Sequence, residues 1–148
     1  EKVVAPQRSK TNTFGYSNKD FFASADVYYI IPFSQKISAK YLTAILNSKL
    51  YFFWFYNKGK RKGEMLELYQ KPLTETLIKM TNQILAFEVL IEKIIENKKQ
   101  NIDTTDLEQQ IDNLVYKLYE LTYDEVLVVE PEFAERMSRE EYEGLKVE

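Results

Sequence analysis

The sequence predicts an α+β fold, in which a small mixed β-sheet with one packed helix precedes an antiparallel α-helical hairpin. Short runs of β-branched and aromatic residues that end at prolines fill the first third of the chain. The second half instead repeats apolar residues at steps of three and four. At 148 residues with no cysteine, the chain is long enough to bury a core without disulfides.

The expected strands lie mainly near the N-terminus. Val3–Val4 is a β-branched start that ends before Pro6. Residues 26–32 are rich in strand formers and suit a strand with little solvent exposure. A further strand is expected over residues 65–69, because it alternates in polarity and ends before Pro72.

One helix is expected between these strands. Ser38 is the expected N-cap, and apolar residues recur at helical spacing out to about Tyr56. Gly59 should end the helix by supplying the left-handed residue that is common at helix C-termini. The six aromatic residues 51–56 point all around such a helix, so most of them must be core. Base stacking is the less favoured interpretation of this run.

The second half is expected to be helical. Apolar seams from Met80 to Ile94 and from Leu107 to Leu121 indicate an antiparallel hairpin packed like a short coiled coil. Capping boxes are expected at Thr105, Thr122 and Ser138, because each is followed three residues later by glutamate. The last box would begin one exposed helix.

These elements divide the chain into three parts: an α+β domain (residues 1–79), a helical hairpin that spaces or docks it (residues 80–131), and an acidic tail (residues 132–148). Charge divides at the first boundary. Residues 1–79 contain 13 basic and 6 acidic residues, whereas residues 80–148 contain 7 and 17. The basic first part is expected to bind an anionic partner, and a dipolar surface without a partner is the alternative.

Composition excludes several chemistries. With neither histidine nor cysteine, the chain cannot form a Cys/His zinc site, a thiolate nucleophile or an imidazole-based triad. Its four glycines form neither a dinucleotide fingerprint nor a P-loop. We therefore expect no catalytic residue, metal or cofactor in this chain. No apolar run could span a membrane, and the absence of cysteine and of a signal peptide fits a cytoplasmic location.

The candidate functional residues are cations and amides from two regions. Four cations fall within five residues after the expected helix, more than its C-terminal dipole requires, and they repel one another unless an anion binds. The predicted DNA-binding residues are Arg8, Lys10, Asn12, Lys19, Lys58, Lys60, Arg61 and Lys62. Lysines are expected to contact phosphates, whereas Arg8, Asn12 and Arg61 are the expected base readers. A merely solvated loop is the alternative.

Five segments carry a family resemblance: Lys2-Val3-Val4-Ala5-Pro6, Phe14-Gly15-Tyr16, residues 22–30, residues 41–50 and residues 111–122. Together they resemble the TaqI-like C-terminal specificity domain of bacterial adenine-N6 DNA methyltransferases, which include fused type IIG restriction–modification enzymes. The chain departs from the family pattern at Lys71-Pro72-Leu73, where an Ile-Pro-Ile-Pro-like turn is usual. No two prolines are adjacent, so the methyltransferase tetrapeptide Asn-Pro-Pro-Tyr is absent.

The resemblance implies a target-recognition domain severed from its catalytic domain, which agrees with a chain that does not start with methionine. Its implied partners are double-stranded DNA and the methyltransferase domain of the same parent chain. S-adenosylmethionine is implied for that parent, and magnesium if the parent also cleaves DNA. Half of a type I restriction specificity subunit, or a helical protein-interaction module, are the alternatives.

Overall fold

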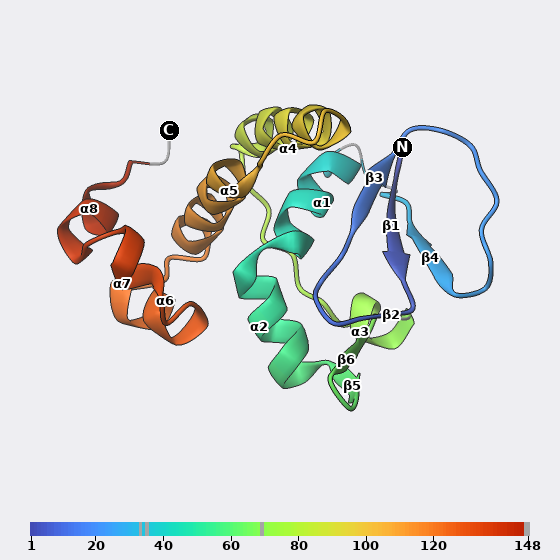
Figure 1. The fold of residues 1–148 in the computed structure, drawn as a ribbon, viewed down its shortest axis with the longest axis horizontal. Helices are drawn as coiled ribbons and strands as arrows, with labels where there is room; N and C mark the ends of the chain where they lie inside the picture. Colours follow the sequence, from blue (N-terminus) through green and yellow to red (C-terminus); the bar gives the residue numbers. More distant parts are fainter. Residues whose placement is uncertain (33, 35, 69, 147–148) are drawn as a thin grey trace.

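The computed structural model describes residues 1–32, 34, 36–68 and 70–146, and it confirms the α+β class (Figure 1). Its strands are β1 (Lys2–Pro6), β2 (Arg8–Ser9), β3 (Gly15–Ser17), β4 (Val27–Ile30), β5 (Lys60–Lys62) and β6 (Met65–Glu67). Its helices are α1 (Ala39–Asn47), α2 (Lys49–Lys58), α3 (Gln70–Thr74), α4 (Ile84–Lys99), α5 (Thr105–Leu118), α6 (Tyr123–Val129), α7 (Phe133–Arg136) and α8 (Arg139–Gly144). Helices α1 and α2 stand between the strands and helices α5–α8 (Figure 1).

The described strands form two three-stranded sheets, in the orders β3-β1-β4 and β2-β6-β5, and neighbouring strands in both sheets are antiparallel. In the first sheet, Val3 and Ala5 of the central strand are fully buried, because alternate residues of β1 face the core. The expected burial of the strand at β4 is wrong. Its Tyr29 and the following Ile31 are 39% and 68% exposed, since β4 is an edge strand with one face open to water.

The expected single helix is instead two helices that meet at Ser48. The backbone of Ser48 is extended, and its hydroxyl accepts a hydrogen bond from Tyr51 N to cap α2. The side chain of Asn47 bonds the backbone N–H and carbonyl of Phe14, both at 2.8 Å. Such side-chain bonds to backbone compete with a continuous helix. The N-cap at Ser38 is confirmed.

Gly59 does not adopt the expected left-handed conformation, because its φ is −73°. Glycine is needed there for a close approach: a Cβ on Gly59 would lie 2.4 Å from the carbonyl oxygen of Phe55. The left-handed glycine is Gly63, with φ at +61°, in the turn between β5 and β6. The chain therefore leaves α2 directly into β5, and what was expected to be a basic loop is a strand.

Helices α4 and α5 form the expected helical pair, but their seams differ from the prediction. Met80 precedes α4 and is 46% exposed. On α5 the fully buried residues are Val115 and Tyr116, whereas Leu114 and Leu118 of the predicted seam are only partly buried. The seam is rotated because α5 packs on α2 and α1 as well as on α4.

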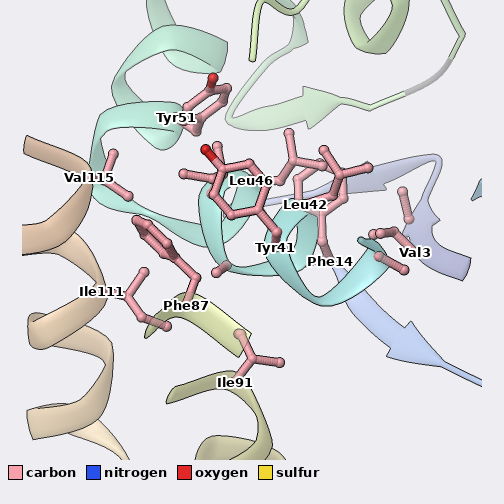
Figure 2. Close-up of a cluster of buried hydrophobic side chains, with 14 of the residues drawn as sticks. Val3, Phe14, Tyr41, Leu42, Leu46, Tyr51, Phe87, Ile91, Ile111 and Val115 are labelled. Atoms are coloured by element: carbon pink, nitrogen blue, oxygen red, sulfur yellow. The ribbon is translucent and has the colours of Figure 1, made fainter. Parts of the chain in front are cut away.

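One core joins the predicted first two parts of the chain. Figure 2 shows Val3 and Tyr41 in the same cluster as Phe87, Ile111 and Val115. The ring of Tyr41 packs edge-on against Phe87, with centroids 5.2 Å apart. Residues from both sides of Lys79 build this cluster. The division of the chain at Lys79 stays a prediction.

A second, smaller core holds the C-terminal helices together. Capping boxes form at Thr122 and Ser138, as expected. The box at Thr105 does not form, because α5 begins one residue earlier and Thr104 donates to the Glu108 carboxylate. The last helix is not simply exposed: Tyr142 is 1% exposed in a cluster that also contains Tyr116, Tyr123, Val126 and Phe133.

None of the helices within the described residues has the length and apolar character that a membrane crossing requires.

Candidate nucleic-acid interface

Most of the predicted basic residues converge on the second sheet, strands β2, β6 and β5, which we call the basic sheet. Lys60, Arg61 and Lys62 form its edge strand β5, and all three are exposed. Side chains of a strand alternate between its two faces, so both faces of β5 are open to water. The hairpin of β5 and β6 lies at the lower edge of the molecule in Figure 1, beside the C-terminus of α2.

A buried carboxylate organises one face of the basic sheet. Arg8 of β2 and Lys60 of β5 both stand opposite Glu67 of β6. Arg8 Nε lies 3.4 Å and Lys60 Nζ 3.6 Å from the two Glu67 oxygens. The Glu67 side chain is 5% exposed, whereas those of Arg8 and Lys60 are 43% and 67% exposed. One buried negative charge thus fixes two cations that still reach solvent.

Arg61 points to the other face, because its cross-strand partner is Leu66 rather than Glu67. Its guanidinium carbon lies 4.1 Å from the centre of the Tyr56 ring. Tyr56, in the last turns of α2, is 44% exposed. The four neighbouring cations therefore do not act as one cluster: Lys60 and Lys62 share a face, and Arg61 stacks on the opposite side.

Lys58, Lys62 and Lys10 complete the basic surface. Lys58 lies in the last turn of α2, where it complements the helix dipole. Lys62 is paired across the ladder with Met65, and Lys10 directly follows β2. All three are exposed, and none has an ion pair with another residue that the structure describes.

Asn12 has a structural position that conflicts with its expected base-reading role. Its amide nitrogen donates to the carbonyl oxygens of Leu46 and Ser48, at 2.7 and 2.9 Å. These bonds satisfy backbone oxygens where α1 ends. A base contact through this nitrogen would break both, so we assign Asn12 to the helix junction.

Lys19 lies away from the basic sheet. Its backbone carbonyl accepts a hydrogen bond from Lys2 Nζ at the start of β1, whereas Arg8 follows the end of that strand. The five residues of β1 lie between these two points and span roughly 15 Å, at about 3.3 Å per residue. Lys19 is therefore not part of the basic surface.

Sequence reasoning missed two residues of the site, Glu67 and Tyr56. Glu67 lies in a run that was read only as a strand, and its pairing with Arg8 joins residues 59 positions apart. The aromatic run allows the phenol end of Tyr56 to lie at the surface, but it does not predict the contact with Arg61. The available signal was its position at the end of that run, five residues before Arg61, but only the turn at Gly59 brings them together.

A pocket of about 560 Å³ lies away from the basic sheet and is lined by Tyr16, Lys40 and Glu92 among others. Lys40 is paired with Glu92 at 2.5 Å, and this hydrogen bond raises the pKa of Lys40. Burial and a hydrogen bond to Glu1 raise the pKa of Tyr16 to about 12. Neither group is poised to exchange a proton at neutral pH.

No group of three or more acidic residues that could hold a metal occurs among the residues with described positions. The glycines are dispersed over β3, the end of α2, the β5–β6 turn and the end of α8. They therefore build no phosphate-cradling loop.

The basic sheet lies within the part of the chain that a family model matches. Residues 1–78 match the model of the TaqI-like C-terminal specificity domain. The chain belongs to this family. The matched residues of this TaqI-like specificity domain include every strand, helices α1–α3, and the junction at Ser48.

Two relatives are type II methyltransferases. The TaqI-like domain is 33% identical over 116 residues to type II methyltransferase M.HincII of Haemophilus influenzae, an alignment that covers 69% of this chain and 23% of the relative. It is 32% identical over 116 residues to M.HindII of Haemophilus influenzae (strain ATCC 51907 / DSM 11121 / KW20 / Rd), covering 69% and 22%. The chain thus spans less than a quarter of these relatives.

Proposed function

We propose that this chain is the DNA target-recognition domain of an adenine-specific methyltransferase in a type II restriction–modification system. The observation that supports this most is the edge strand Lys60–Lys62, whose cations are exposed on both faces in a chain of the specificity-domain family. The major groove of B-DNA admits a two-stranded β-ribbon. The β5–β6 hairpin has this form.

In this proposal, the lysines of the basic sheet contact phosphates and set the register of the domain on the duplex. Phosphate contacts position a protein, whereas base contacts specify the sequence. Binding would hold the duplex so that a target adenine can be flipped into a catalytic pocket outside this chain. The relatives leave room for that pocket, since more than three quarters of their length lies outside the alignment.

S-adenosylmethionine, the implied methyl donor, does not fit the residues present. The dispersed glycines offer no loop for it, and in the lining of the pocket of about 560 Å³ Lys40 and Glu92 are already paired with each other. We therefore propose that the donor binds the catalytic part of the protein, and no chemical step is assigned to this chain.

The proposal is tested by fluorescence anisotropy with a labelled duplex across a salt series. Each lysine that contacts a phosphate adds about one to the slope of log affinity against log salt. The double variant Lys60→Ala/Lys62→Ala should bind more weakly and lose about two from this slope.

A matched control removes two exposed lysines of α4, as Lys93→Ala/Lys99→Ala. This variant loses the same net charge but should keep the slope of the unmodified chain. Equal losses in both double variants would show that only overall charge matters. An unmodified chain that is folded but binds no duplex at low salt would refute the proposal.

A further inference from the structure

Arg61 differs from the lysines beside it in what holds its side chain. Lys60 faces the Glu67 carboxylate, whereas the Arg61 guanidinium lies over the Tyr56 ring, 4.1 Å from its centre. Within the described part of the chain, no carboxylate lies in ion-pair distance of Arg61. The aromatic face, not a counter-charge, therefore orients this cation.

This arrangement leaves the hydrogen-bonding edge of the arginine available. A guanidinium carries five N–H donors in its own plane, and it stacks on aromatic rings through its face. Contact with Tyr56 through this face leaves the in-plane N–H donors available, and Arg61 donates none of them to another described residue. It also restricts a long side chain before any ligand binds, which lowers the entropy lost on binding.

The backbone that carries Tyr56 and Arg61 is also held in a fixed geometry. Tyr56 belongs to α2, and Arg61 is the middle residue of β5. Between them, the close contact of Gly59 with the Phe55 carbonyl fixes how the helix turns into the strand. Both partners thus stand on regular elements joined by a single residue, Gly59, where a side chain would collide with the Phe55 carbonyl.

We propose that Arg61, positioned by Tyr56, reads the O6 and N7 atoms of a guanine in the major groove. This inference rests on the proposed function and names the reading residue within it. A bidentate arginine–guanine contact needs a fixed plane, which the stack supplies. A phosphate needs only a point charge, which Lys58, Lys60 and Lys62 already offer. Tyr56 is a positioning residue in this scheme.

The test begins with selection of preferred duplexes from a random-sequence library by the unmodified chain. A required G·C pair is expected in the selected sites. Arg61→Lys keeps the charge but removes the fork, so the preference for this pair should disappear while non-specific affinity changes less than threefold. Tyr56→Leu should weaken the same preference in the same position. Lys62→Ala, the matched control, should lower affinity for all sequences alike and keep the preference.

A second measurement identifies the atom. Replacing the required guanine with 7-deazaguanine removes N7, and the unmodified chain should bind that duplex about tenfold more weakly. The Arg61→Lys variant should bind the 7-deazaguanine duplex as tightly as it binds the duplex with guanine. Thermal unfolding of each variant checks that the fold is intact.

The outcomes separate this inference from the proposed function. Salt-dependent binding with an unchanged sequence preference in Arg61→Lys would overturn the reading role and leave the DNA-binding proposal standing. Equal losses on specific and non-specific duplexes would make Arg61 a phosphate contact, and binding without any preference would also overturn the inference. No binding at all would refute both.

Discussion

Two buried glutamates, Glu67 in the basic sheet and Glu130 after α6, show opposite uses of charge. Their side chains are 5% and 6% exposed, and each meets two cations. At Glu67 the cations are 3.4 and 3.6 Å away and largely solvated. At Glu130 both cations are closer, and Arg136, at only 17% exposure, donates from two nitrogens at 3.1 and 2.9 Å.

The Glu130 cluster ties the C-terminal helices to α2. Lys49, the first residue of α2, pairs with the Glu130 carboxylate, and the Tyr116 hydroxyl donates to it at 3.0 Å. Burial opposes ionisation of Glu130, but hydrogen bonds from Arg136 and Lys49 hold its pKa below the usual value. Nearby, the Lys49 backbone N–H donates to Asp112 at 2.8 Å.

The difference lies in how many charges remain for a partner. Around Glu130, a second carboxylate, Asp112, also interacts with Lys49 and Arg136, so two negative charges match two positive ones and stabilise the fold. Around Glu67, one carboxylate meets two cations, and further exposed lysines stand beside them. Solvated ion pairs contribute little to stability. The excess positive charge of the basic sheet is therefore better explained by a ligand than by folding.

The strongest test of this comparison is the pair of variants Glu130→Gln and Glu67→Gln. Loss of the Glu130 charge leaves Arg136 and Lys49 without their shared carboxylate, which should lower the free energy of unfolding by about 3 kcal/mol. Glu67→Gln should cost about 1 kcal/mol or less, because its cations reach water. Urea denaturation measures both values. Similar losses in the two variants would contradict the distinction.

Gly59→Ala asks whether backbone geometry, rather than ion pairing, positions the basic sheet. The added Cβ would meet the Phe55 carbonyl oxygen at 2.4 Å, so α2 and β5 must shift. We expect a loss of about 1–3 kcal/mol in thermal or urea unfolding. Gly144→Ala is the control, since no atom lies within 4 Å of the added group. If Gly59→Ala matched this control, the close approach would not constrain the hairpin.

A pH titration probes the buried cluster through Asp112. Burial, opposed by the Lys49 N–H bond, raises the pKa of Asp112 from 3.8 to about 6, with Glu130 raising it and Arg136 lowering it. The folded chain therefore takes up a proton at higher pH than the unfolded chain. Through this group alone, stability rises by about 2 kcal/mol as the pH falls from 7 to 4.

Asp112→Asn removes this contribution and keeps an acceptor for Lys49 N. As the pH falls from 7 to 4, the unmodified chain should gain about 2 kcal/mol of stability relative to the variant. Urea denaturation at each pH measures this difference. Comparing the two proteins cancels the opposite trend of Glu130, whose lowered pKa causes a loss of stability in acid. A stability difference that does not change with pH would contradict the raised pKa of the buried Asp112 carboxyl.

The smallest expected effect is that of Lys19→Ala on DNA binding. Lys19 is exposed but stands at the far end of β1 from Arg8. Its removal should change duplex affinity less than twofold in the anisotropy assay, whereas Lys62→Ala should reduce the salt slope by about one. A loss from Lys19→Ala equal to that from Lys62→Ala would extend the DNA-binding surface beyond the basic sheet.

The sequence by itself determined the α+β class, the two helices α4 and α5 of the hairpin, and the family. It also determined the caps at Ser38, Thr122 and Ser138. These features depend on local periodicity and on hydrogen bonds within about four residues, which spacing alone reveals. The basic strand was also visible as charge, although its form as a strand was not.

Only the tertiary structure decided which basic residues act together. The break at Ser48 is supported by Asn47, which bonds Phe14 from 33 residues away, and Asn12 is held at the same junction. The register of the basic sheet puts Arg8 beside Glu67, 59 residues on, and turns Arg61 to the opposite face. Long-range register follows from how the whole core packs, because shifting a strand by one residue exchanges its faces.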